Sequence, residues 1–507
     1  MTRKKPLTIR LHDGDNVVVV RVNLSAGAEI SEESITCLDQ IPFGHKIATS
    51  AIQAGGAVIK YGQIIGFASG DIKAGEHVHL HNLVLKNFDR DYAISADAKD
   101  TMPEAQPASF EGIVRSDGRI ATRNYLGVIS TVNCSASVSR FVADSFRGDA
   151  LAGFPHVDGV VPICHGVGCG CSNADESFEL LMKTLAGYIR HPNFAGVLVV
   201  GLGCEVMQIE TLLQRTNLQE NPFLQTMTIQ DTGGTKKTVQ EGIERIRVML
   251  PEANRIERQP VSASHLILAL ECGGSDAYSG ITANPALGAA VDRLVRHGGT
   301  AVLGETPEIY GAEHLLTRRA VSRGVGQKLL DHIQWWENYA GSHNAEMNNN
   351  PSPGNKAGGL TTILEKSLGA AAKGGTTNLV EVYGYAEAVA AKGFVFMNTP
   401  GYDPASLTGM VAGGANAICF STGRGSVYGC KPVPSIKLAT NDAMFRRMED
   451  DMDINCGDVI EKDTSIEEMG EHIFNFILKV ASGKKTKSEV NGIGEDEFVP
   501  WTIGATM

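Results

Sequence analysis

Cysteines stand at the ends of several short apolar runs in this sequence. VDGVVPIC (157–164) ends at Cys164, GVLVVGLGC (196–204) ends at Cys204, and HLILALEC (265–272) ends at Cys272. A deprotonated thiol is a ligand for soft or borderline metals such as Fe²⁺ or Zn²⁺. The spacing is not that of zinc-finger CxxC pairs, and cysteine also serves as a small hydrophobe in protein cores. The local motifs therefore leave both interpretations open.

Neighbouring residues divide the cysteines into two groups. Cys169, Cys204 and Cys272 adjoin glycine, and Glu205 and Glu271 adjoin two of them. We therefore predict metal ligands at Cys169, Cys204 and Cys272, with Cys134 and Glu205 as further ligands. Apolar packing, a strand end or a turn is expected of the others that we considered, namely Cys37, Cys164, Cys171, Cys419 and Cys430.

Three glycine-rich stretches carry residues suited to an acidic, hydroxylated substrate. ECGGSDAYSGITANPALG (271–288) places Ser275 and Asp276 just beyond an apolar run, and PGNKAGG (353–359) carries Asn355 and Lys356. FSTGRGSVYG (420–429) carries Arg424, whose guanidinium could pair with a carboxylate through two hydrogen bonds. The alternatives are a solvated loop for Lys356 and a turn with an exposed arginine for Arg424. Near the N-terminus, His12, His77, His79 and His81 suggest a metal or proton-transfer patch, or simply a half-exposed edge strand.

The overall composition limits the class of protein. The chain has 507 residues, 43% hydrophobic and 20% charged, with a net charge of −12. Such a balance is typical of a soluble multidomain protein and argues against nucleic acid as the main partner. No stretch is apolar for long enough to span a bilayer, and no secretory signal is recognisable. We expect a cytoplasmic protein with free thiols and without a membrane or nucleic-acid partner.

The pattern of elements predicts how these residues are positioned. Residues 1–86 consist of short alternating strands with turn signals, and 87–110 is a polar stretch typical of a linker. From residue 111, apolar strands alternate with helical segments, which predicts a parallel sheet covered on both faces. Ligands bind outside the carboxyl ends of such strands. We therefore expect the strand-end thiols to converge in one crevice, although the strand order cannot be deduced.

Several long motifs together resemble the altronate/galactarate dehydratase family of sugar-acid dehydratases. They are RSDGRIATRNYLGV (115–128), HGVGCG, GLGCE, ECGGSDAYSGITANPALG, GETPEIYGAEHLL, NPSPGNKAGGLTTILEKSLG, FSTGRGSVYG and DMDINCG (451–457), and they extend over nearly the whole chain. The resemblance implies a β-clip module of the SAF type at 1–86, a linker at 87–110 and a second α/β domain at 111–258 that takes part in dimerisation. It also implies a C-terminal Rossmann-like, mostly parallel catalytic domain at 259–507 and a homodimer.

The resemblance further implies loss of water from an aldonate or aldarate to give a 2-keto-3-deoxy acid, with a divalent metal. Fe²⁺ is the expected ion, with Mn²⁺ as the alternative. TPEIYGAEHLL is more similar to altronate dehydratase, whereas DMDINCG is closer to galactarate dehydratase. We assign the base to His165 or Lys366, and substrate binding to Ser275, Asp276, Asn355, Lys356 and Arg424.

Two other classes of protein remain as alternatives. A NAD-dependent oxidoreductase is suggested by the alternation of strands and helices, but the chain lacks a GxGxxG fingerprint after the first strand. A sugar-acid binding protein without catalysis would share the same motifs. Product formation from altronate or galactarate distinguishes both from a dehydratase.

Overall fold

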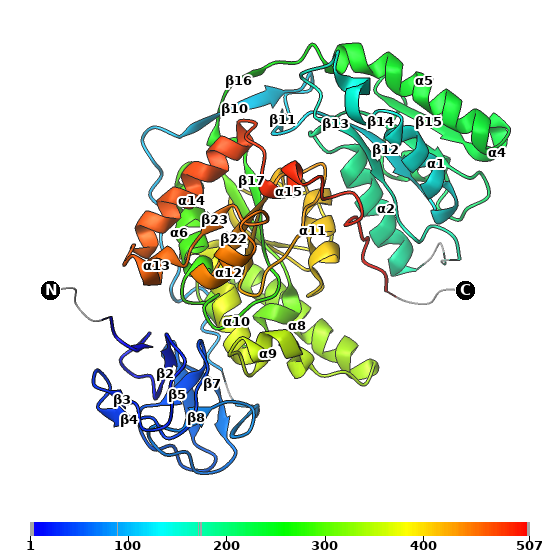
Figure 1. Cartoon of the computed structure of the whole chain (residues 1–507). Helices are drawn as coiled ribbons and strands as arrows, with labels where there is room; N and C mark the ends of the chain where they lie inside the picture. The colour runs from blue at the N-terminus through cyan, green and yellow to red at the C-terminus, as the bar shows by residue number, and fades with distance from the viewer. Residues whose placement is uncertain (1–4, 89, 171, 173–174, 504–507) are drawn as a thin grey trace.

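The computed structural model describes residues 5–88, 90–170, 172 and 175–503. Cys171 lies outside them. Three regions follow one another along the chain, and Figure 1 shows the N-terminal region in blue beside the C-terminal one, with the second region on the opposite side. None of the helices among the described residues is both long and apolar enough to cross a membrane.

The N-terminal region is built of short antiparallel strands, as the alternating pattern predicts. One sheet has the order β1-β2-β5-β8 and a second has the order β6-β7-β9. A hydrophobic run fills the interior, since all four valines of β2 are buried. The strands are β1 (Thr8–Ile9), β2 (Val17–Val20), β3 (Glu29–Ile30), β4 (Ile35–Thr36), β5 (Lys46–Ala48), β6 (Ala57–Lys60), β7 (Gln63–Ala68), β8 (His77–Val78) and β9 (Leu83–Val84).

The second region holds a four-stranded parallel sheet with the order β13-β12-β14-β15. Its strands are nearly all apolar, because helices cover both faces. The core on one face joins α1 and α5 to the sheet, and the core on the other face includes α2. The elements are β12 (Tyr125–Ser130), α1 (Asn133–Asp144), β13 (Gly159–Ile163), α2 (Glu176–Ile189), β14 (Phe194–Gly201), α3 (Ile209–Arg215), β15 (Leu224–Thr228), α4 (Ile229–Thr232) and α5 (Thr235–Ala253).

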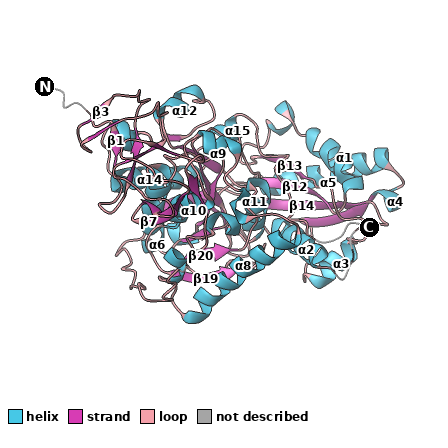
Figure 2. Ribbon diagram, turned by 90° about the horizontal axis from the view of Figure 1, so that it is seen from below, coloured by secondary structure: helices cyan, strands magenta, loops and turns pink. Residues whose placement is uncertain are grey.

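A small antiparallel sheet with the order β11-β10-β16 joins the second and third regions. Its strands are β10 (Ser109–Val114), β11 (Ile120–Ala121) and β16 (Arg258–Ser262). The core around α2 continues into the third region and takes in Leu407 and Met410 of α11. Figure 2 shows α11 between the strands of the two parallel sheets. The two regions thus pack against each other through a shared apolar core.

The C-terminal region is organised around a seven-stranded parallel sheet with the order β19-β20-β18-β17-β21-β22-β23. Numbered along this region, the order is 3-4-2-1-5-6-7, which departs from the 3-2-1-4-5-6 order of dinucleotide-binding sheets. The parallel sheet was predicted, but its strand order was not. The strands are β17 (Ile267–Cys272), β18 (Thr300–Leu303), β19 (Leu379–Tyr383), β20 (Gly393–Met397), β21 (Ala417–Thr422), β22 (Ser435–Ala439) and β23 (Ile454–Asn455).

Helices cover both faces of this sheet. α6 and α14 share one apolar core with the strands, whereas α11 lies in the core on the other face. The chain leaves β17 toward β18 on one side and returns later to β21 on the other, so β17 lies at the topological switch point where ligands bind in open α/β sheets. The helices are α6 (Ala283–Arg296), α7 (His314–Thr317), α8 (Arg323–Ser342), α9 (Pro353–Ala357), α10 (Ile363–Ala371), α11 (Asp403–Ala412), α12 (Asp442–Arg447), α13 (Asp458–Glu461), α14 (Ile466–Ala481) and α15 (Lys487–Val490).

Candidate active site

Charged and thiol side chains gather at the carboxyl edge of the seven-stranded sheet, where β17, β18 and β20 end. β17 ends in Glu271 and Cys272, and Glu305 follows β18 in a left-handed conformation with φ +59°. Such a conformation is strained for a residue other than glycine and is common at functional sites. A 3₁₀ turn (Thr306–Ile309) then carries Glu308, and α11 begins with Asp403. We call this group, together with the two lysines described next, the acidic cluster.

Two buried lysines neutralise part of the acidic cluster. The ammonium of Lys373 donates to Cys272 Sγ at 2.8 Å and to Glu305 Oε2 at 2.9 Å. The ammonium of Lys366, on α10, donates to Glu308 Oε1 at 2.5 Å and to Asn350 Oδ1 at 2.8 Å. Charges removed from water need partners of this kind. The result is two ion pairs side by side at one strand edge.

These contacts fix where protons reside. Burial raises the pKa of the Cys272 thiol to about 12, with a further rise from the charge of Glu305, so the thiol stays protonated at neutral pH. Burial alone would lower the pKa of Lys366, but the carboxylate of Glu308 raises it more, and the ammonium form prevails. Burial and the charge of Glu305 raise the pKa of Glu308, which makes its carboxylate a stronger base than usual.

Some oxygen atoms of the acidic cluster have no hydrogen-bond partner. Glu271 Oε1 and Glu305 Oε1 are buried and unpaired, and Gly273 leaves room for Asp403, because a Cβ there would lie 2.1 Å from Asp403 Oδ2. Burial, followed by the charges of Glu305 and Glu308, raises the pKa of Asp403 to about 7. One oxygen from each of Glu271, Glu305 and Asp403 lies within 4.8 Å of the others. Buried carboxyl groups this close to one another fit a divalent cation that prefers oxygen ligands.

The predicted residues Ser275, Asp276 and Asn355 lie beside the acidic cluster. Together with Cys272 and Lys366, Ser275 and Asp276 line a cavity of about 10 Å³. The hydroxyl of Ser275 is buried and unpaired, so it is free to bind a substrate. Asp276 instead accepts hydrogen bonds from Ser279, Thr440 and Asn441. Asn355 completes the capping box that Ser352 begins at the start of α9, and it donates to the Ser275 carbonyl at 2.8 Å, so Asp276 and Asn355 hold the loop that presents Ser275.

The N-terminal region covers this cavity. Glu365 of α10 accepts from Lys46 at 2.9 Å and from Lys60 at 2.8 Å, and all three side chains are almost completely buried. Tyr61 reaches the cavity wall because Gly280 has no side chain; a Cβ there would lie 2.5 Å from the tyrosine hydroxyl. A cavity of this volume holds about one water molecule. The cavity in this structure is therefore too small for a sugar acid.

Helix α9, which carries Lys356, and the loop that carries Arg424 border the same edge of the sheet, so the sequence expectation of a loop at Lys356 is corrected. The backbone carbonyl of Lys356 accepts from His79 Nε2 at 3.0 Å, and its side chain is half-buried. His79 belongs to a histidine group with His45, His77 and His81, in which His45 Nδ1 and His77 Nε2 lie 3.0 Å apart. Arg424 is exposed, and its backbone N–H donates to the Gly274 carbonyl at 2.8 Å.

The expectation that all the strand-end thiols share one crevice is wrong, because Cys272 lies at a different sheet from the others. Cys134, Cys169 and Cys204 follow β12, β13 and β14 of the four-stranded sheet, whereas Cys272 ends β17 of the seven-stranded sheet. The sequence alternates strands and helices in the same way in both regions. It therefore does not show that the strands form two separate sheets. Glu205 is buried and accepts from Thr131 Oγ1 and from the N–H groups of Leu202 and Gly203, so it holds the loop before Cys204.

His165 also lies in the second region, away from the acidic cluster. It is 7% exposed, its Nε2 lies 3.0 Å from the Ser130 carbonyl oxygen, and its ring contacts Phe498. Burial lowers its pKa to about 4. The structure therefore brings together Lys366, Cys272, Ser275, Asp276 and Asn355, and leaves His165 with Cys134, Cys169, Cys204 and Glu205 at the other sheet.

Sequence reasoning missed most of the acidic cluster. Glu271 and Glu305 follow apolar runs, and that position was their signal. The other three acidic-cluster residues do not directly follow a strand. Glu308 lies in a 3₁₀ turn, Lys373 lies in the turn that ends α10, and Asp403 begins α11. Only the packing of these segments over β17 identifies them.

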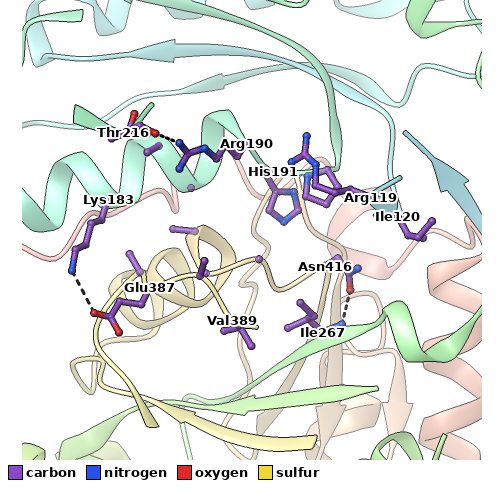
Figure 3. Close-up of a pocket in the computed structure, with 18 of the residues that line it drawn as sticks. Arg119, Ile120, Lys183, Arg190, His191, Thr216, Ile267, Glu387, Val389 and Asn416 are labelled. Atoms are coloured by element: carbon purple, nitrogen blue, oxygen red, sulfur yellow. Dashed lines mark hydrogen bonds and ion pairs between the residues drawn. The ribbon is translucent and has the colours of Figure 1, made fainter. Parts of the chain in front are cut away.

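A second, wider cavity lies at the opposite, amino-terminal edge of the seven-stranded sheet. It has a volume of about 970 Å³ between the second and third regions. Figure 3 shows Arg119, Arg190 and His191 along one wall, and Lys183 paired with Glu387 at 3.5 Å. The ends of α2 and α11 also reach it, and helix carboxyl ends attract cations. The acidic cluster, with its buried ion pairs and unpaired oxygen atoms, is the better catalytic candidate.

Comparisons with known proteins match all three regions of the chain. Residues 6–86 match the altronate/galactarate dehydratase SAF domain, 112–254 match the second domain of D-galactarate dehydratase/altronate hydrolase, and 263–506 match the C-terminal D-galactarate/altronate dehydratase domain.

Among curated proteins, the chain is 38% identical to galactarate dehydratase (L-threo-forming) of Escherichia coli (strain K12), over 94% of this chain and 93% of that protein. It is 35% identical to altronate dehydratase of Bacillus subtilis (strain 168), over 96% and 97% of the two chains. It is 34% identical to altronate dehydratase of E. coli (strain K12), over 96% and 97%. The chain therefore belongs to the D-galactarate/altronate dehydratase family, whose members are hydro-lyases, and it carries the SAF domain of that family.

Proposed function

We propose that the protein removes water from a six-carbon sugar acid to give a 2-keto-3-deoxy acid, at the acidic cluster of the seven-stranded sheet. The family supports the reaction class. The observation that carries the location is the buried Glu308–Lys366 pair, in which a strengthened carboxylate base lies 2.5 Å from an ammonium acid. An elimination needs one group of each kind on the two reacting carbons.

The reaction follows from these two groups. Glu308 takes the proton from C2 of the substrate, and Lys366 gives a proton to the hydroxyl that leaves C3 as water. The resulting enol tautomerises to the 2-keto acid. Proton transfer from Glu308 back to Lys366 across their hydrogen bond restores the starting state. The raised pKa of Lys366 thus suits an acid better than the base that the sequence suggested.

Other residues bind and orient the substrate in this proposal. The unpaired hydroxyl of Ser275 meets a substrate oxygen, while Asp276 and Asn355 fix its loop. Lys356 and Arg424 lie on segments next to the Ser275 loop, and in this proposal their side chains pair with the carboxylates of the substrate. Galactarate carries a second carboxylate where altronate carries a hydroxymethyl group, so the number of cations engaged decides between them. We propose D-altronate and galactarate as the two candidate substrates.

A divalent metal, Fe²⁺ or Mn²⁺, fits the unpaired oxygens of Glu271, Glu305 and Asp403. A bound ion would stabilise the negative charge that develops on the substrate carboxylate when C2 loses its proton. Cys272 is a poorer ligand, because Lys373 already contacts its sulfur. We retain the homodimer and the cytoplasmic location as proposals, and sedimentation of the purified chain tests the former.

The deciding experiment is a product assay. Purified protein, reduced and supplied with Fe²⁺, is incubated with altronate, galactarate and a panel of their epimers, and 2-keto-3-deoxy acids are measured. We expect turnover of altronate or galactarate, and none by Glu308→Gln. If no sugar acid is converted while one binds, the alternative of a binding protein is correct.

A further inference from the structure

The second region carries a group of cysteines that the proposed reaction does not use. Of the nine cysteines among the described residues, Cys134, Cys169 and Cys204 are exposed and the other six are buried. The three exposed ones follow β12, β13 and β14, which are adjacent and parallel. Because the carboxyl ends of parallel strands share one edge, three thiols from distant parts of the sequence are placed along one rim. We call them the rim thiols.

Hydrogen bonds tie the three loops together at this rim. The N–H of Asn133, next to Cys134, donates to the Val167 carbonyl at 3.0 Å. The N–H of Met207 donates to the carbonyl of Gly168, next to Cys169, at 3.1 Å. Glu205 joins the Cys204 loop to Thr131 through a 2.8 Å hydrogen bond. Neighbouring backbone atoms of each loop are therefore fixed relative to the others.

Glycines make this close approach of the loops feasible. Gly168 has φ +100°, and a Cβ at this position would lie 2.2 Å from the Thr131 carbonyl oxygen. Gly203 has φ +124°, and a Cβ there would lie 2.5 Å from Gln230 Oε1. The amide of Gln230 in turn donates to Cys204 Sγ at 3.4 Å. The glycines beside Cys169 and Cys204 thus serve to bring the thiol loops against the ends of β12 and β15.

The rim also favours negative charge. Cys134 lies in the first turn of α1, whose first turn carries no acidic residue. The positive end of the helix dipole therefore faces the rim, and the first turn of α1 places no carboxylate beside it.

In this structure the three rim thiols do not lie as close together as the ligands of a single metal ion would. A single tetrahedral ion binds thiolates at about 2.3 Å and so holds them about 3.8 Å apart. Among the described residues, the groups of three potential ligand atoms within 4.8 Å of one another contain no rim thiol. An iron–sulfur cluster holds its cysteines further apart, because each sulfur binds a different iron atom.

We propose that Cys134, Cys169 and Cys204 bind an iron–sulfur cluster at the rim of the four-stranded sheet. Three thiolates leave one iron of a four-iron cluster without a cysteine ligand, so that iron is open to water or another oxygen ligand. The site is distinct from the acidic cluster, which offers mainly oxygen ligands and a thiol already bonded to Lys373.

The test measures bound iron and acid-labile sulfide in the full-length protein, purified and reconstituted without oxygen. We expect both in equal amounts, with visible charge-transfer absorption. Each of Cys134→Ser, Cys169→Ser and Cys204→Ser should lower both by about tenfold or more. Cys164→Ser is the matched control, since this buried thiol ends the same strand that precedes Cys169 and donates to the Ala136 carbonyl; it should retain the cluster.

Three outcomes would overturn the proposal: bound metal without sulfide, no metal at all, or a cluster that survives in the serine variants. Glu308→Gln separates this proposal from the proposed function. That variant should lose dehydration and keep its iron and sulfide, so failure of one proposal does not imply failure of the other. Circular dichroism of the serine variants confirms that they fold.

Discussion

The two parallel sheets of this protein place cysteines at equivalent positions and surround them differently. At the seven-stranded sheet, Cys272 is 1% exposed and lies among carboxylates and lysines beneath the SAF domain. At the four-stranded sheet, Cys134, Cys169 and Cys204 are exposed, and the nearby carboxylate of Glu205 is used within its own loop. The reactivity expected of a strand-end cysteine therefore depends on whether other segments bury it, and not on its position at the end of a strand. Burial among charged side chains shifts the pKa values of Cys272 and Glu308, whereas the exposed thiols stay available for the proposed binding of iron.

The largest difference between the rims should appear in catalysis. Glu308→Gln removes the proposed base while preserving size, and we expect kcat to fall by about 10³-fold, as for loss of a general base. Glu205→Gln is the matched control, a buried carboxylate at the other rim, and should change kcat only a few-fold. Steady-state assays of both variants with the preferred sugar acid provide the measurement. An equal loss in both would move the reaction to the four-stranded sheet.

The next largest effect should be on stability, when the ion pairs that hold the N-terminal region over the acidic cluster are broken. Glu365→Gln leaves Lys46 and Lys60 buried without their shared carboxylate, which should reduce the free energy of unfolding by about 3 kcal/mol. The paired charges hold the pKa of Glu365 well below its usual value, although burial opposes this. Urea denaturation measures the change. The exposed pair Lys183–Glu387 offers a control, because Glu387→Gln should cost little.

Asp403→Asn should stabilise the metal-free protein in a pH-dependent manner. The pKa of Asp403 is raised by burial and by Glu305 and Glu308 from 3.8 to about 7, so the wild type loses stability as pH rises through this interval. The variant lacks this loss. It should be as stable as wild type below pH 4 and more stable by about 2 kcal/mol above pH 7, half of the full linkage because the side chain is partly exposed. Urea denaturation with a chelator at pH 5 and pH 8 checks this; a gap that narrows with rising pH would contradict it.

The smallest expected effect is on the affinity for the divalent ion. Glu271→Gln should weaken binding of Fe²⁺ or Mn²⁺ to chelator-treated protein by at least about tenfold, because one of three oxygen ligands loses its charge. Titration of Mn²⁺ followed by electron paramagnetic resonance measures the affinity. Cys204→Ser should bind Mn²⁺ as the wild type does, since manganese prefers oxygen to sulfur. Loss of Mn²⁺ binding in Cys204→Ser alone would assign this ion to the thiols instead.

The sequence by itself determined the family, the β-rich N-terminal region and the parallel sheets. Long motifs and apolar strands alternating with helices carry this information locally. It also placed Lys366, Ser275, Asp276 and Asn355 near one site, because each lies in a glycine-rich motif at a strand or helix end. It could not separate Cys272 from the other thiols, since the repeating pattern does not show where one sheet ends and the next begins.

Only the tertiary structure decided how the acidic cluster is composed. Glu308, Lys373 and Asp403 come from a 3₁₀ turn, a helix end and a helix start that no periodic pattern marks, and packing over β17 brings them together. The shift in their proton affinities depends on burial and on charges contributed by distant segments. Likewise, the exposure that distinguishes the rim thiols arises from what each sheet edge packs against. Contacts between residues far apart in the chain set these properties, and a linear pattern does not record them.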